Sequence, residues 1–110
     1  MKEDVLKIIN HYGVMPQLKY FQSEVFELNE AIIDAEHNRY IGIVREPCES
    51  CIKHIAEEIA DVIVMLYQFQ EYYNISDDEI DEIMIEKIDR QLDRIKSEVN
   101  NEICKYKKRL

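Results

Sequence analysis

Apolar residues recur every three or four positions along almost the whole chain, which is the spacing of one face of an α-helix. The pattern predicts a short helix over residues 2–11 and long helices over about 16–37, 49–73 and 76–100, beyond which we expect the chain to fray. No stretch alternates as a strand would. We therefore predict the all-α class, a bundle of three long helices and a short N-terminal helix, whose short connections make neighbouring helices antiparallel.

Helix-breaking and helix-capping residues mark the predicted boundaries. Gly13 ends the first helix, and a glycine and a proline place a connection over residues 38–47. Ser76, followed three residues later by a glutamate, has the spacing of a capping box at the start of the last helix. Arg39 and Arg45 in the connection either face an anionic ligand or are simply solvated.

Two acidic pairs lie inside the second and third predicted helices, Glu24 with Glu27 and Glu58 with Asp61. Residues three apart share one face of a helix, so the two carboxylates of each pair lie about one turn apart. On a helical wheel both pairs flank an apolar stripe, and we expect the stripes to form the core. The stripes are Phe21, Val25, Leu28 and Ile32 in one helix and Ile55, Ile59, Val62 and Leu66 in the other, and the acidic flanks continue to Ala31 and Met65.

Packing of these two helices would bring four carboxylates to one site, where like charges favour protons or a cation. Charges at the edge of a core are costly unless they are paired or bind a metal. Carboxylates without histidine in register suit Mg²⁺, and no Glu-x-x-His motif of a di-iron bundle occurs in the chain. His54 lies one turn before Glu58, and either contacts this site or has an ordinary structural role.

Length, composition and charge limit the function classes. A chain of 110 residues with 46% apolar and 34% charged residues is expected to fold as one domain spanning residues 1–110. The net charge of −9 argues against a nucleic-acid-binding surface, which needs a basic patch. We expect no membrane insertion and a cytoplasmic location, because the chain has neither a run of eighteen apolar residues nor a leader.

Three cysteines are an odd number, which suits a reducing compartment without a disulfide framework. Cys48 and Cys51 have CxxC spacing, but a zinc site needs a fourth ligand and Cys104 is far along the chain. Redox chemistry of the thioredoxin type would need a βαβ setting. The pair is therefore predicted to supply small residues at a loop-to-helix junction, with zinc and redox roles as the less favoured alternatives.

Residues 17–32, with Glu24-x-x-Glu27-Leu28, and residues 57–62, with Glu58-Ile59-Ala60-Asp61, together resemble the MazG-like branch of the all-α nucleoside triphosphate pyrophosphohydrolases. The resemblance covers about residues 12–94. It implies an enzyme that cleaves between the α- and β-phosphates and releases a nucleoside monophosphate and pyrophosphate. Glu24, Glu27, Glu58 and Asp61 would be the catalytic residues and would bind Mg²⁺, with Mn²⁺ as a substitute.

The same resemblance implies that Lys87, Arg90 and Arg94 contact the substrate phosphates. Their alternative role is an ordinary exposed helix face, on which acidic residues alternate with them. The chain departs from the family pattern at Ser23, where many relatives have a glutamate, and at Ile88, where an asparagine is common. The alternative function is a non-catalytic helical interaction module that retains the fold.

Apolar residues outside the stripes predict association with further copies. They are Ile33, Ile63 and Tyr67, which three long helices and a short one cannot all cover. We expect a homodimer or a homotetramer, with a nucleoside triphosphate as the small-molecule partner.

Overall fold

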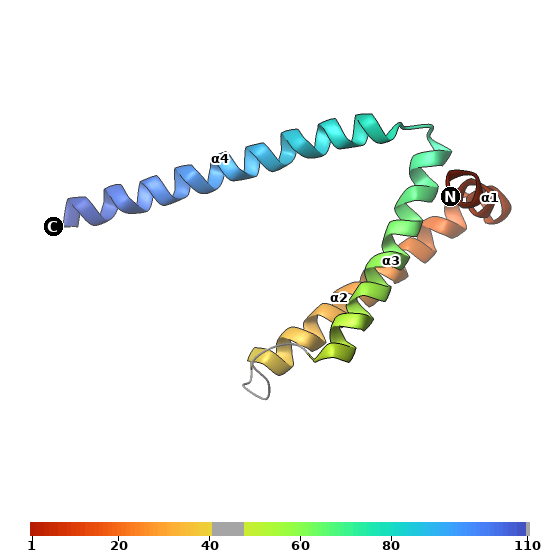
Figure 1. Cartoon of the computed structure of the whole chain (residues 1–110), viewed down its shortest axis with the longest axis horizontal. Helices are drawn as coiled ribbons and strands as arrows, with labels where there is room; N and C mark the ends of the chain where they lie inside the picture. Colours follow the sequence, from red (N-terminus) through yellow and green to blue (C-terminus); the bar gives the residue numbers. More distant parts are fainter. Residues whose placement is uncertain (41–47, 110) are drawn as a thin grey trace. The chain divides into compact units, whose positions relative to one another are not determined.

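The computed structural model describes residues 1–40 and 48–109, and these residues form four α-helices and no strand. The helices are α1 (Lys2–Tyr12), α2 (Val14–Tyr40), α3 (Glu49–Tyr72) and α4 (Asp77–Arg109) (Figure 1). The predicted all-α class is confirmed. Among the described residues, no helix combines the length and the apolar character needed to cross a membrane.

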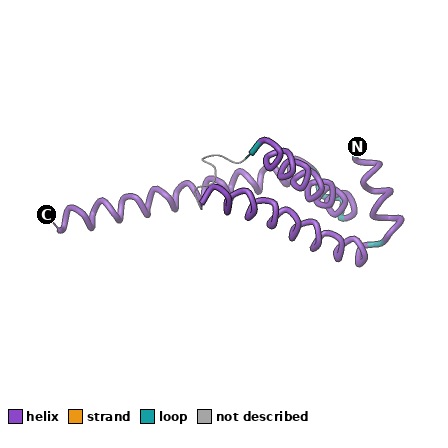
Figure 2. Tube along the Cα trace, turned by 90° about the horizontal axis from the view of Figure 1, so that it is seen from below, coloured by secondary structure: helices purple, strands orange, loops and turns teal. Residues whose placement is uncertain are grey.

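The chain divides into two compact units, residues 1–74 and residues 75–110. In the first unit, α3 packs against both α2 and α1, and α2 and α3 run side by side in opposite directions (Figures 1 and 2). The second unit is α4 with the residues that lead into it. The prediction of one domain over residues 1–110 stays a prediction.

The turn between α1 and α2 follows the predicted glycine. Gly13 has φ +93° and ψ 158°, a backbone conformation that side chains disfavour, and its N–H donates to the carbonyl of Ile9 at 2.8 Å. Val5 and Ile9 are the buried residues of α1. The turn thus directs the apolar face of α1 back onto the helix pair.

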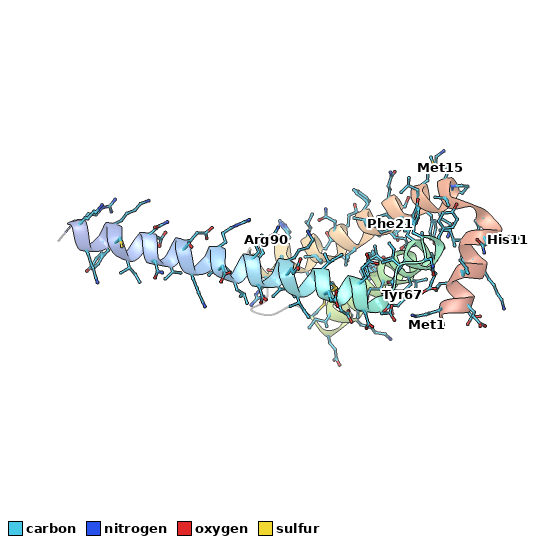
Figure 3. All side chains as sticks on the ribbon, turned by 90° about the horizontal axis from the view of Figure 1, so that it is seen from above. Met1, His11, Met15, Phe21, Tyr67 and Arg90 are labelled. Atoms are coloured by element: carbon cyan, nitrogen blue, oxygen red, sulfur yellow. A yellow bond between two sulfur atoms is a disulfide. The ribbon has the colours of Figure 1, made fainter. Side chains whose placement is uncertain are left out.

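The contact between α2 and α3 follows a seven-residue repeat on each helix, as in an antiparallel coiled coil. We call this contact the α2–α3 seam. Its residues are buried or half-buried, and they are Gln17, Phe21, Glu24, Leu28, Ala31 and Ala35 on α2 and Cys51, Ile55, Glu58, Val62, Met65 and Phe69 on α3. Phe21, labelled in Figure 3, and Phe69 meet edge to face across the seam, with ring centroids 5.6 Å apart.

The seam corrects the predicted core. Val25, Ile32, Ile59 and Leu66 belong to the predicted stripes but are exposed in the chain. The acidic flank is buried instead, at Ala31, Met65 and Glu24. A helical wheel predicts that the most apolar positions are at the centre of the contact. Two paired helices, however, bury only the narrow strip of residues that faces the partner helix. Half of each apolar stripe is therefore left uncovered.

Helix α4 begins as predicted and ends later than predicted. The backbone N–H of Glu79 donates to Ser76 Oγ at 3.1 Å, and Asn74 makes the preceding turn with φ +54°. The expectation of fraying beyond residue 100 is wrong, because α4 continues to Arg109. The acidic residues in the first turn and the basic residues in the last turn both interact favourably with the helix dipole, which helps to stabilise the helix as far as Arg109.

No residue of α4 is buried. Seven of its apolar positions nevertheless form one stripe with a repeating spacing of four, four and three residues, an eleven-residue period. All of them are exposed: Met84, Ile88, Leu92, Ile95, Val99, Ile103 and Tyr106. The described residues of this unit therefore leave the apolar face of α4 uncovered.

Candidate metal centre

Three of the four predicted carboxylates meet at the α2–α3 seam. Glu24 and Glu27 come from α2 and Glu58 from α3, and one oxygen from each lies within 4.8 Å of the other two. Glu24 and Glu58 occupy inward positions of the seven-residue repeat, and the next turn of α2 adds Glu27. The antiparallel pairing of two separate acidic motifs therefore creates the cluster.

The cluster combines negative charge with burial. Glu24 is only 5% exposed, Glu58 is half-buried and Glu27 is exposed. The Oε2 atoms of Glu24 and Glu58 are buried and have no hydrogen-bond partner. A buried charged oxygen without a partner is costly, and a cation that binds oxygen could supply the missing partner. Carboxylate oxygens are the ligands that Mg²⁺ prefers, so these residues fit that ion.

Asp61, the fourth predicted ligand, lies outside the group of three. It is exposed on α3 and lines the same cavity as Glu24. Its charge also acts on Tyr20, which neighbours Glu24 on α2. Asp61 therefore lies at the edge of the cluster, on the side of the cavity.

Tyr20 joins the site through its hydroxyl group. A hydrogen bond to the Glu24 side chain is the largest cause that raises the pKa of Tyr20, and the negative charges of Glu24, Asp61 and Glu27 add to it. Sequence reasoning missed this residue. The available signal was its position four residues before Glu24, which places both side chains on one helix face.

His54 lies beside Glu58, which agrees with the first of the two alternatives that the sequence left open. Its Nε2 is 3.9 Å from Glu58 Oε1, and the His54 side chain is 57% exposed while that of Glu58 is 12% exposed. An exposed imidazole here reaches solvent on one side and the Glu58 carboxylate on the other. The residue can therefore meet an anionic group that approaches Glu58.

A cavity of about 560 Å³ adjoins the carboxylates within the first unit. Its lining is mostly apolar and aromatic with a few polar groups: Ile8, Tyr12, Pro16, Gln17, Tyr20, Glu24, Asp61, Val64, Met65 and Gln68. At its buried side, Gln17 Nε2 donates to Gln68 Oε1 at 2.7 Å. Sequence reasoning missed both glutamines, although Gln17 precedes Glu24 by one seven-residue repeat.

The predicted cationic residues are spread over different parts of the chain. Arg39 is in the last turn of α2, where its Nη1 lies 3.5 Å from Glu36 Oε1, and Arg45 lies outside the described residues. Lys87, Arg90 and Arg94 are exposed on α4, in the second unit; Figure 3 labels Arg90. Within α4 they follow one another at intervals of three and four residues, on one side of the helix.

The cysteines depart from the prediction of a chain without disulfides. Cys48 and Cys51 are joined by a disulfide with Cα atoms 5.1 Å apart. Cys104 is a free, exposed cysteine on α4. Three residues of separation at the start of a helix bring two sulfurs within bonding distance, which an odd cysteine count by itself does not reveal.

Comparisons of the chain with protein-family models, with curated proteins and with solved structures find no match. The resemblance to the MazG-like enzymes thus stays a prediction from the two acidic motifs.

Proposed function

We propose that the chain is a Mg²⁺-dependent nucleoside triphosphate pyrophosphohydrolase, which releases a nucleoside monophosphate and pyrophosphate. The observation that carries the proposal is the cluster of Glu24, Glu27 and Glu58, with two buried oxygens that lack partners. A structural role for three converging carboxylates would leave their repulsion uncompensated. Mg²⁺ held there would neutralise phosphate charge and lower the pKa of an attacking water.

The packing of the chain positions the proposed metal ligands, and its net charge affects the approach of the substrate. The seam fixes Glu24 and Glu58 on two packed helices, so the carboxylates are positioned before the substrate arrives. Asp61 extends the negative edge toward the cavity. A net charge of −9 disfavours a free triphosphate, which makes its approach dependent on a bound cation.

The cavity beside the cluster suits a nucleoside. Its volume of about 560 Å³ falls within the range of small-molecule sites. Tyr12 and Tyr20 offer aromatic faces for a base, and the amides of Gln17 and Gln68 offer polar groups. The triphosphate of a nucleoside bound in the cavity would extend past Glu24 and Asp61. This supports a binding mode with the nucleoside in the cavity and the phosphates next to the metal.

Basic residues are proposed to receive the leaving pyrophosphate. Lys87, Arg90 and Arg94 share one side of α4 and are exposed, as a phosphate contact requires. His54, beside Glu58, is proposed as a further phosphate contact.

A homo-oligomer, dimer or tetramer, in the cytoplasm completes the proposal. The uncovered residues include Ile33, Ile63 and Tyr67, as predicted, together with the whole apolar face of α4. Burial of such surface is favourable by roughly 25 cal/mol per Å². The same exposed face also favours the second candidate, a non-catalytic helical interaction module.

One experiment separates the two candidates. Purified full-length protein with Mg²⁺ is incubated with a panel of canonical and modified nucleoside triphosphates, and the products are resolved by anion-exchange chromatography. We expect equal amounts of monophosphate and pyrophosphate from at least one substrate, and loss of turnover in Glu24→Gln and Asp61→Asn. Glu30→Gln, an exposed change on the same helix, is the matched control.

Absence of hydrolysis across the panel, with no Mg²⁺-dependent change in melting temperature, would favour the interaction module. Unchanged turnover in both carboxylate variants would overturn the site assignment.

A further inference from the structure

The disulfide between Cys48 and Cys51 lies at the first turn of α3. Cys48 is the N-cap residue, and its Sγ accepts a hydrogen bond from the backbone N–H of Cys51 at 3.2 Å. Ser50 Oγ lies 3.3 Å from the same sulfur. A disulfide sulfur carries no proton, so the Ser50 hydroxyl is the donor. Two donors therefore point at Cys48 Sγ.

This environment favours a negative charge on Cys48 once the disulfide is opened. The N-terminus of a 24-residue helix presents backbone N–H groups and the positive end of its dipole. Thiolates are stabilised at such helix starts, particularly in Cys-X-X-Cys pairs. Cys48 is exposed while Cys51 is half-buried, so the two sulfurs are not equivalent to an incoming reactant.

We propose that Cys48 and Cys51 form a reversible thiol–disulfide exchange site, with Cys48 as the sulfur that reacts with low-molecular-weight thiols of the glutathione class. The proposal is independent of the nucleotide hydrolysis proposed above, because it uses no residue of the carboxylate cluster.

The exchange balances with two equivalents of the external thiol. The first thiolate attacks Cys48 Sγ, a bond forms between those sulfurs, and the Cys48–Cys51 bond breaks with its electron pair on Cys51 Sγ, which takes a proton from water. The second thiolate attacks the external sulfur of this mixed disulfide. Cys48 leaves as the thiolate stabilised at the helix start, and the external thiols leave as their disulfide. The cysteine pair is reduced by two electrons.

Cys104 provides an internal reference in the same chain. It is a free, exposed cysteine near the C-terminal end of α4, far from the first turn of that helix. Its neighbouring backbone N–H groups are inside a continuous helix and are not available to a sulfur. A reaction governed by exposure alone would treat Cys104 and Cys48 alike.

The test has two measurements on the full-length protein. In the first, wild type is equilibrated in buffers of varied reduced-to-oxidised glutathione ratio, acid-quenched and alkylated, and the masses are read by mass spectrometry. We expect the pair to pass from disulfide to dithiol within the accessible ratios. A pair that stays fully oxidised in the most reducing buffer, or fully reduced in the most oxidising one, would overturn the proposal.

In the second measurement, Cys51→Ser is treated with oxidised glutathione and, separately, with iodoacetamide at mildly acidic pH. We expect the mixed disulfide on Cys48 rather than on Cys104, and alkylation of Cys48 about tenfold faster or more. Cys48→Ser keeps a strong N-cap residue, so it is a folded control that should lose the fast reaction. Equal rates at Cys48 and Cys104 in Cys51→Ser would overturn the exchange site. Protection of Cys48 and Cys51 from alkylation by stoichiometric Zn²⁺ in the reduced wild type would also overturn it.

Discussion

Gln17 and Gln68 join α2 to α3 through a buried hydrogen bond of 2.7 Å, beside the carboxylate cluster. Gln68 is 2% exposed, and its own Nε2 lies 3.5 Å from Met65 Sδ. Buried amides need partners, so the bond fixes how the two helices are aligned as well as how tightly they pack. Both glutamines also line the cavity that Glu24 borders.

We expect Gln17→Leu to lower the free energy of unfolding by about 1–3 kcal/mol, because it leaves the Gln68 carbonyl buried without a donor. Urea unfolding followed by circular dichroism measures this. The double variant Gln17→Leu with Gln68→Leu should recover much of the loss, since both polar groups are then gone. Gln22→Leu, an exposed change on α2, is the control. A double variant no more stable than the single one would contradict this account.

Glu24→Gln should stabilise the protein in the presence of a chelator by about 1 kcal/mol, because it removes one of three like charges held within 4.8 Å. The same change should abolish the rise in melting temperature that Mg²⁺ produces in the wild type. Differential scanning fluorimetry with and without Mg²⁺ reads both effects. Glu30→Gln should retain the Mg²⁺ response, and an equal response in Glu24→Gln would argue against the cluster as the metal centre.

The raised pKa of Tyr20 predicts that the stability of the protein depends on pH in the alkaline range. Its pKa in the folded chain is raised above 10.0, chiefly by the hydrogen bond to Glu24, so the protonated phenol is the form that folding favours. The resulting stability is fully present below the unfolded-state pKa and is lost as pH rises through the folded-state pKa. The stability difference between wild type and Tyr20→Phe should therefore be constant near neutral pH and shrink above about pH 10.

Urea unfolding at several pH values measures this difference. Repeating the comparison in a Glu24→Gln background is the control, because it removes the charge of the main partner and should weaken the pH dependence. A stability difference that does not change up to strongly alkaline pH would refute the Tyr20–Glu24 interaction.

The apolar face of α4 predicts self-association. Ile95 lies on the stripe and Ser97 lies across the helix from it, and both are exposed in the single chain. Ile95→Asp places a charge where we expect burial between copies, so it should shift the protein toward smaller species. Size-exclusion chromatography with light scattering reports the mass, and Ser97→Asp should leave it unchanged. A wild type that is monomeric at micromolar concentration would refute the prediction.

Local signals in the sequence were sufficient for the helices. Gly13 and Ser76 mark their turns through backbone freedom and capping, which depend on neighbouring residues alone. The prediction is wrong at the C-terminal end of α4, because the apolar period continues past Asn100 and Asn101 and the helix extends to Arg109.

The site was only partly within reach of the sequence. The spacing of Glu24 and Glu27 predicts a shared face, but contact with Glu58 depends on how α3 is aligned against α2. Tyr20 and Gln68 were missed for the same reason, since nothing in their local sequence marks their partners.

The sequence by itself determined the all-α class, the two acidic motifs, and the helix boundaries to within three residues, except at the C-terminal end of α4. Only the tertiary structure decided that the seam takes one half of each apolar stripe together with the acidic flank beside it, and that three carboxylates converge there while Asp61 stays at the edge. The physical reason is that periodicity defines a face of each helix, whereas the part of that face that becomes buried depends on the register and rotation of the partner helix.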